Sequence, residues 1–309
     1  LLVVGLVAVC TSGASASIII DTVSVGNPGN APDTRYDAVG FGAVGYTFNM
    51  GRYEVTAGQY TAFLNAVAAS DTYGLYNANM GSIPSFGVNI QRAGSSGSYT
   101  YSVAADWADR PVNYVSWGDS ARFANWMHNG QPTGAQNLST TEDGSYFLNG
   151  ATSDAAQIAV TRKPSATWVI PSEDEWYKAA YHKNDGMTGS YWDYPTGTNA
   201  LPSNVLSNPD PGNNANYYND NGYTIGNAYY TIGSPYYRTQ VGDFENSDSP
   251  YGTFDQGGNV WEWNQAILFG SYRGWRGGSF GNGDYGLHAS YRYLYDFPSG
   301  ESNIVGFRV

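Results

Sequence analysis

The sequence has few cysteines, histidines and charged residues. Its 309 residues include one Cys and three His, and only 13% are Asp, Glu, Lys or Arg, about half of the ~25% usual in soluble domains. A single cysteine excludes an internal disulfide framework. The chain also contains no H-E-x-x-H zinc motif and no G-x-x-x-x-G-K-[ST] phosphate loop, so these two common catalytic patterns are excluded.

Basic residues are scarcer than acidic ones. The 14 Lys and Arg residues against 26 Asp and Glu residues give a net charge of −12, which argues against a nucleic-acid partner because such a partner needs a basic face. With 41% hydrophobic and 16% aromatic residues, the chain is too apolar for intrinsic disorder. The 39 Gly and 27 Tyr instead predict an aromatic-rich, loop-rich globular protein whose acidic groups are available to cations.

The first sixteen residues resemble a secretory signal. An apolar run over 1–9 precedes Cys10, and Ala14-Ser-Ala16 matches a signal-peptidase site. The run is too short to span a bilayer, and no later stretch is long and apolar enough to do so. Val9 is not the small residue that a lipid-anchor motif requires. We therefore predict a signal peptide over 1–16, truncated at its start, and a single secreted or cell-surface domain over 17–309 that contains no cysteine.

Local patterns predict three helices, each preceded by a capping box. Thr56 with Gln59, Ser116 with Asp119 and Ser172 with Glu175 are N-cap pairs three residues apart. Apolar residues at helical spacing follow each pair. We expect helices over 57–68, after Ser116 and over 173–182, with long polar loops over 70–110 and 184–255. Short strands are predicted at 46–48, 53–55, 111–115, 145–148, 157–161, 168–170, 260–264, 276–280, 288–293 and 306–309, with a hairpin within 88–103.

A series of ordered motifs resembles one known family. The motifs are Tyr53-Glu-Val-Thr, Arg110-Pro-Val-Asn, Ile170-Pro-Ser-Glu-Asp-Glu-Trp176, Gly258-Asn-Val-Trp-Glu-Trp263, Arg276-Gly-Gly-Ser-Phe280 and Gly306-Phe-Arg-Val309. Together they resemble the sulfatase-modifying-factor family, whose founding activity is that of the formylglycine-generating enzyme. The resemblance implies an α+β fold, a variant of the C-type lectin fold with short twisted sheets, few helices and more than half loop, ordered by calcium.

The catalytic cysteines of that family are absent. The enzymes carry two cysteines five residues apart after the G-G-S motif, and their thiolates bind copper. The corresponding segment here has Asn282 and Leu287 near those positions. A related branch uses iron held by three histidines, but His128, His182 and His288 are scattered. We therefore expect neither copper nor iron, and a pseudoenzyme rather than an active formylglycine-generating enzyme.

The resemblance implies two calcium sites. The first would use the side chains of Asp255 and Glu262 with the carbonyls of Gly258 and Val260, and oxygen ligands of this kind suit calcium. The alternative for Glu262 is an ion pair with an arginine. The second site would begin at Asn216 and Tyr217. The motif arginines Arg292 and Arg308 are interpreted as buried ion-pair or carbonyl-binding residues.

An aromatic strip follows the segment that forms the catalytic groove in the enzymes. The expected groove residues are Trp275, Asn282, Asp284, His288, Tyr291, Tyr293 and Tyr295. Rings on one face of a strand can bind a sugar or an extended peptide. The alternative is that these tyrosines only cover a loop-rich surface.

Three functional hypotheses remain open. The preferred one is a secreted, calcium-ordered, monomeric module that binds or displays a glycan or peptide. The second is a cysteine-independent oxidoreductase of the same superfamily. The third is a surface protein of the kind varied by diversity-generating retroelements. Fold alone does not separate them, because function depends on the site.

Overall fold

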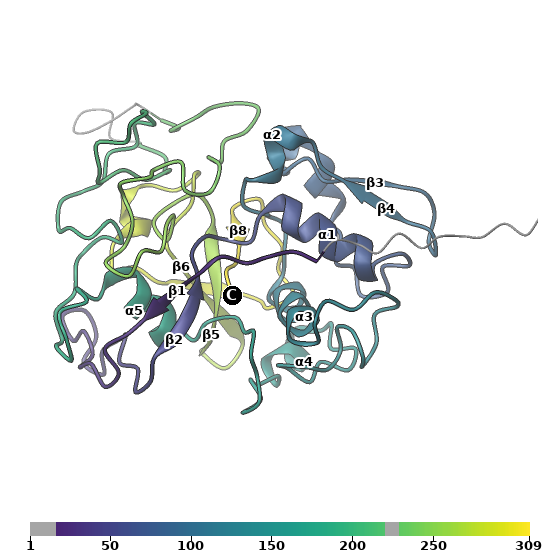
Figure 1. Cartoon of the computed structure of the whole chain (residues 1–309), viewed down its shortest axis with the longest axis horizontal. Helices are drawn as coiled ribbons and strands as arrows, with labels where there is room; N and C mark the ends of the chain where they lie inside the picture. The colour runs from purple at the N-terminus through teal and green to yellow at the C-terminus, as the bar shows by residue number, and fades with distance from the viewer. Residues whose placement is uncertain (1–16, 220–228) are drawn as a thin grey trace, which may run out of the picture.

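The computed structural model describes residues 17–219 and 229–309 (Figure 1). The predicted signal peptide therefore lies outside the described residues. About 35% of the residues are in regular secondary structure, which confirms an α+β protein made mostly of loops. Within the described ranges, no helix is both long and apolar enough to cross a membrane.

A four-stranded sheet forms the centre of the fold. Its strands are β5 (Trp261–Leu268), β6 (Tyr272–Arg276), β7 (Tyr293–Asp296) and β8 (Val305–Gly306), in the spatial order β7-β6-β5-β8. Strand β8 runs parallel to β5, and the other neighbours are antiparallel. The register between β5 and β6 shifts between Trp263 and Ile267. A register shift of this kind is typical of a β-bulge, which bends the strand and redirects the residues that follow.

The three predicted helices are confirmed to within one residue. They are α1 (Ala57–Val67), α3 (Trp117–His128) and α5 (Glu173–Tyr181). Each begins with a complete capping box, in which the N-cap hydroxyl accepts the third backbone N–H and the third side chain accepts the N-cap N–H. The boxes satisfy two of the backbone donors that a helix start leaves without partners.

The remaining elements are short. Strands β1 (Thr22–Val25) and β2 (Phe48–Gly51) pair with each other, and β3 (Gln91–Ala93) and β4 (Thr100–Ser102) form the hairpin predicted within 88–103. The other helices are α2 (Ala105–Ala108), α4 (Asp154–Ile158) and the 3₁₀ turns η1 (Ala78–Gly81), η2 (Ile83–Ser85) and η3 (Asp284–Leu287).

Several predicted strands are wrong. The 53–55 and 111–115 segments are not strands; Val55 donates to the Phe307 carbonyl at 2.9 Å and accepts from Val112 at 2.9 Å, as separate contacts. Much of 157–161 belongs to α4 or follows it. The strand predicted at 276–280 ends at Arg276, and that predicted at 288–293 begins only at Tyr293. Each of these segments contributes buried residues to the interior without forming a continuous ladder.

The main core joins the sheet to α1 and α3. It contains Phe63, Phe123, Trp126, Trp261 and Trp263, all at most 2% exposed. Phe123 packs edge-on against Phe307 of the C-terminal segment, with ring centroids 5.2 Å apart. Figure 1 shows α1 to α4 and the β3–β4 hairpin on one side of the central strands, with α5, β1, β2 and many long loops on the other. The C-terminus lies between these two sides.

A pair of carboxyl groups lies beside the start of α3. Asp119, the third residue of the helix, contacts Glu301 in the loop before β8. The side chain of Asn77 donates to Glu301. Burial, and then the negative charge of Asp119, raises the pKa of Glu301 to about 8. The pair therefore holds a proton at neutral pH.

This proton makes stability depend on pH. Between about pH 4.5 and 8 the folded protein keeps the Glu301 proton that the unfolded chain has lost, so the free energy of unfolding falls as pH rises through that window. We expect Glu301→Gln to flatten this dependence and to unfold at a higher temperature than the wild type at pH 8. Thermal unfolding followed by circular dichroism from pH 5 to 8 measures it.

The matched control is Glu245→Gln, which changes an exposed carboxylate and is expected to leave the slope unaltered. Parallel pH profiles for the wild type and Glu301→Gln would contradict the assignment.

Candidate functional site

The site begins with a fully buried ion pair between β5 and the C-terminal segment. Arg308 donates from Nε to Oε2 of Glu262 at 2.6 Å and from Nη2 to Oε1 at 2.7 Å. Both side chains are 0% exposed. Arg308 also donates to the carbonyls of Gly51 at 3.0 Å and Phe254 at 2.9 Å. Its prediction as a buried ion-pair and carbonyl-binding residue is confirmed.

The carboxylate of Glu262 has a further donor. The indole Nε1 of Trp176, on α5, donates to Oε2 at 2.7 Å. Both oxygens of Glu262 therefore accept N–H groups. The structure shows the arginine pair that the sequence left open as the alternative, and Glu262 presents no unengaged oxygen to a calcium ion in this arrangement.

Asp255 lies in the loop before β5. Its backbone is left-handed, with φ of 59°, and its Oδ2 accepts the Gly242 N–H at 2.6 Å. Burial raises the pKa of Asp255 to about 7, and the nearby negative charges of Asp243 and Glu262 add to this while Arg308 opposes it. The neutral form of the Asp255 carboxyl is therefore favoured at a higher pH than for an ordinary aspartate.

A third carboxylate, Glu54, was missed by sequence reasoning. Its side chain is 1% exposed, and neither oxygen has a hydrogen-bond partner among the described residues. Burial raises its pKa well above the usual value, and the charges of Asp255 and Glu262 raise it further. The available signal was its position inside the Tyr53-Glu-Val-Thr motif, directly between Tyr53 and Val55.

The side chains of Glu54, Asp255 and Glu262, here called the carboxylate cluster, outnumber the basic groups beside them. Glu54, Asp255 and Glu262 interact electrostatically with a single guanidinium, that of Arg308. Buried carboxylates without partners are costly unless they bind a proton or a cation. Across 17–219 and 229–309, no group of three or more His, Cys, Asp and Glu side chains is arranged to hold a metal ion. Asp255 and the excess negative charge fit calcium, but further ligands would have to be carbonyls.

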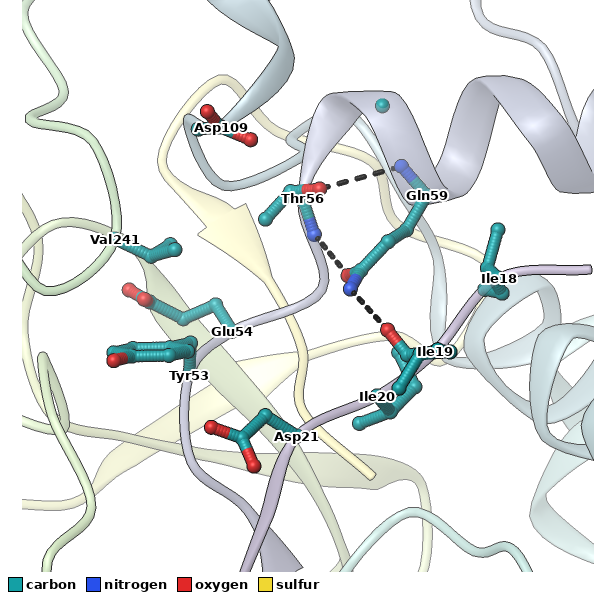
Figure 2. Close-up of a pocket in the computed structure, with 11 residues that line it drawn as sticks. Ile18, Ile19, Ile20, Asp21, Tyr53, Glu54, Thr56, Gln59, Asp109 and Val241 are labelled. Atoms are coloured by element: carbon teal, nitrogen blue, oxygen red, sulfur yellow. Dashed lines mark hydrogen bonds between the residues drawn. The ribbon is translucent and has the colours of Figure 1, made fainter.

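Glu54 also lines a cavity of about 470 Å³. The cavity lies between the N-terminal segment 18–21, the start of α1 and Val241. Figure 2 shows the Glu54 side chain extending toward Val241, while Gln59 donates to the Ile19 carbonyl, a bond of 3.1 Å. Of the three carboxylates, Glu54 therefore lies beside this cavity.

The two expected calcium segments lie side by side. Asn216 forms a parallel bridge with Gly258, and its carbonyl accepts the Asn259 N–H at 2.8 Å. The side-chain oxygen of Asn216 is buried and has no partner among the described residues. Tyr217, by contrast, is 1% exposed and its hydroxyl donates to the Pro202 carbonyl at 2.8 Å.

The expected groove residues fall into two groups. Trp275 is 2% exposed and stacks on Tyr293 with ring centroids 4.7 Å apart, so it belongs to the core and leaves no ring face for a ligand. Tyr291 packs on Trp261 at 5.8 Å and on Tyr285 at 5.0 Å. The side chain of Tyr295 lies outside the described part of the molecule.

The other group forms a half-exposed surface around η3, here called the His288 surface. Of the expected groove residues it contains Asp284 and His288, and it also contains Tyr36, Tyr194 and Tyr285, which the sequence did not predict. The rings of Tyr36 and Tyr194 both meet His288 edge-on, at 5.4 and 5.3 Å. Burial lowers the pKa of His288, which favours the neutral imidazole at physiological pH. Tyr285 is 49% exposed.

The positions that correspond to the copper cysteines are both packed. Asn282 accepts from Trp261 Nε1 at 2.8 Å and from the Ser279 hydroxyl at 2.6 Å. Leu287 is 0% exposed and packs with Ala215 and Tyr217. These two side chains hold the loop together and offer no soft metal ligand.

Comparisons with known proteins agree on one family. The family model described as "Sulfatase-modifying factor enzyme 1-like domain" matches residues 32–309. The solved structure titled "Crystal Structure of CarF" is similar with a TM-score of 0.50 and 16% identity, covering 94% of this chain and 97% of that one. "Treponema denticola variable protein 1" has a TM-score of 0.53 and 17% identity, covering 96% of each chain. No curated protein matches in sequence. The structural likenesses support the fold alone.

The buried ion pair yields a mutational prediction. Glu262→Ala leaves Arg308 charged and without its carboxylate in the interior, so we expect it to lower the free energy of unfolding by about 3–5 kcal/mol. Denaturant unfolding measures this loss. The exposed carboxylate Asp248 provides the control, because Asp248→Ala is expected to change stability by less than about 0.5 kcal/mol. Equal stability of the two variants would contradict the role assigned to the pair.

Proposed function

The chain belongs to the sulfatase-modifying factor enzyme 1-like family, and from this premise we propose that it is a binding or display domain that has lost the family's copper chemistry. Its ligand is a glycan or an extended peptide. The observation that carries the proposal is the replacement of the two thiolate positions by Asn282 and Leu287, whose side chains are committed to packing and hydrogen bonds.

Loss of the cysteines removes the soft ligands that copper requires. The one cysteine of the chain is Cys10, within the predicted signal peptide. Secretion would remove it and leave a domain of 17–309 with no thiol. Oxidation through two thiolates has no counterpart in such a domain.

The His288 surface is the proposed ligand contact. Half-exposed rings, a neutral imidazole and the carboxylate of Asp284 provide stacking faces together with hydrogen-bond donors and acceptors. Sugar-binding and peptide-binding sites use this combination. Tyr285 is the most exposed tyrosine of this surface and is not part of the core. It is therefore the most suitable residue for a mutational test.

Calcium is the proposed ordering ion. Asp255 supplies the side-chain ligand, and the carbonyls of Gly258 and Val260 complete the loop contribution. The excess negative charge at Glu54 and Asp255 supports this, since a divalent cation would offset it. The ion's role is to fix the loop before β5, while Glu262 holds Arg308.

Ligand binding tests the first part of the proposal. We expect a glycan array or a peptide library to yield a ligand whose affinity falls at least about tenfold in Tyr285→Ala, because an aromatic contact is lost from the interface. Phe147→Ala removes a ring that is 52% exposed elsewhere and should bind normally. Equal loss in both variants, or oxygen consumption with a peptide substrate, would overturn the proposal.

Metal analysis tests the second part. We expect about one or two calcium ions per chain, with no copper or iron, and unfolding roughly 5 °C higher in saturating calcium than in chelator. Asp255→Ala should abolish this difference, and Asp248→Ala should retain it. Stoichiometric copper or iron would rule out the binding domain, whereas absence of a calcium effect would rule out only the ordering ion.

A further inference from the structure

A second, smaller cavity lies on a different part of the molecule, beside the bend in β5. Its volume is about 130 Å³, below the ~300 Å³ at which pockets for drug-sized ligands begin and well above the ~30 Å³ share of one water. Trp117 at the start of α3, Arg162 in the loop after α4 and Arg273 in β6 contribute to its wall. None of them belongs to the carboxylate cluster or the His288 surface.

Arg273 is a buried cation without a carboxylate. It is 3% exposed, and the described residues provide it no ion-pair partner. Its Nη atoms donate to carbonyls, including Gln265 at 2.8 Å and Val160 at 2.7 Å, and its guanidinium lies 3.9 Å from the Trp117 ring centroid. Burial lowers the pKa of Arg273 to about 10. Carbonyl dipoles hold this group, but its charge is not offset.

Three of the residues that line the cavity also carry buried donors without acceptors. Among the described residues, Nε of Arg273, Nε of Arg162 and Nε1 of Trp117 are buried and make no hydrogen bond. The other side of Arg162 binds Glu175, with Nη2–Oε2 at 2.6 Å. Glu175 therefore pairs with Arg162 and not with Arg273, and three N–H donors remain unsatisfied. Buried donors of this kind are costly to leave without acceptors.

We propose that this cavity binds a small oxyanion, namely a sulfate, phosphate or carboxylate group, through Arg162, Arg273 and Trp117. An oxyanion supplies several acceptor oxygens and the missing negative charge together, and guanidinium groups match its geometry. An apolar occupant would leave the donors unsatisfied, and a cation would be repelled. Water would satisfy donors but would not offset the charge.

The mouth of the cavity allows entry from solvent. Ile267 lines the cavity and is 46% exposed, and Thr161 lines it and is exposed. The oxyanion therefore enters either as a free ion or as the end of a small organic molecule. In the second case, the rest of the small organic molecule would remain outside the cavity, beyond Ile267.

Titration of the full chain with sodium sulfate, phosphate and acetate at low ionic strength tests the proposal. We expect saturable binding by calorimetry, and a shift of the Trp117 indole N–H resonance, which is identified by its loss in Trp117→Phe. Phenyl phosphate distinguishes the two sources of the ion. Binding comparable to that of phosphate identifies a terminal group, and its exclusion identifies a free ion.

Two variants at the exposed mouth separate an effect of charge on oxyanion binding from an effect of the mutation on folding. Ile267→Glu places a carboxylate at the cavity and is expected to weaken oxyanion binding by about tenfold or more. Ile267→Gln has nearly the same shape without the charge and is expected to bind within about twofold of the wild type. Equal binding by these two variants, a resonance that does not move, or the same weak effect from chloride would overturn the proposal.

Discussion

The ion pair of Arg308 with Glu262 is the interaction on which the rest of the structure depends. One guanidinium contacts the end of β2 through Gly51, the loop before β5 through Phe254, and β5 itself through Glu262. Trp176 adds α5 to the same carboxylate. Because all these groups are removed from water, each needs the others for its hydrogen bonds. Segments with little regular structure are thereby held at one point.

The same pair determines the electrostatics of its surroundings. Once Glu262 is engaged by Arg308, the charges of Glu54 and Asp255 have no equivalent partner. The raised pKa values of Glu54 and Asp255 are one response to that imbalance, and the proposed calcium ion would be another. The oxyanion cavity is the reverse case, since Arg273 is buried without a carboxylate. Both sites arise where a loop-rich interior leaves one sign of charge in excess.

The helices were predictable because their information is local. Thr56, Ser116 and Ser172 each lie three residues from the side chain that completes the capping box, so the boundary is contained in four residues. The strands were less predictable. Val55 has the alternation of a strand, but its partners at Val112 and Phe307 belong to separate segments, and such single contacts leave no signal in sequence.

The site could be predicted only where it coincided with the family motifs. Asp255 and Glu262 stood out in this way, yet the choice between calcium and arginine for Glu262 depended on a residue 46 positions away. The burial of Trp275 against Tyr293 was equally hidden, because alternation along a strand does not reveal which face is covered. Trp117 and Arg273 come together only because α3 packs against β6. No rule based on residue spacing predicts that packing.

The long reach of Arg308 has a consequence for how the protein is made. Its contact with Gly51 joins residues 257 positions apart, and closing so long a loop is slow and brings stability only late. During synthesis, α1 and the β1–β2 pair are complete long before the segment that secures them leaves the ribosome. The contact that secures them can therefore form only after residue 308 has been synthesised, so these early segments lack it for most of the time that the chain is being made.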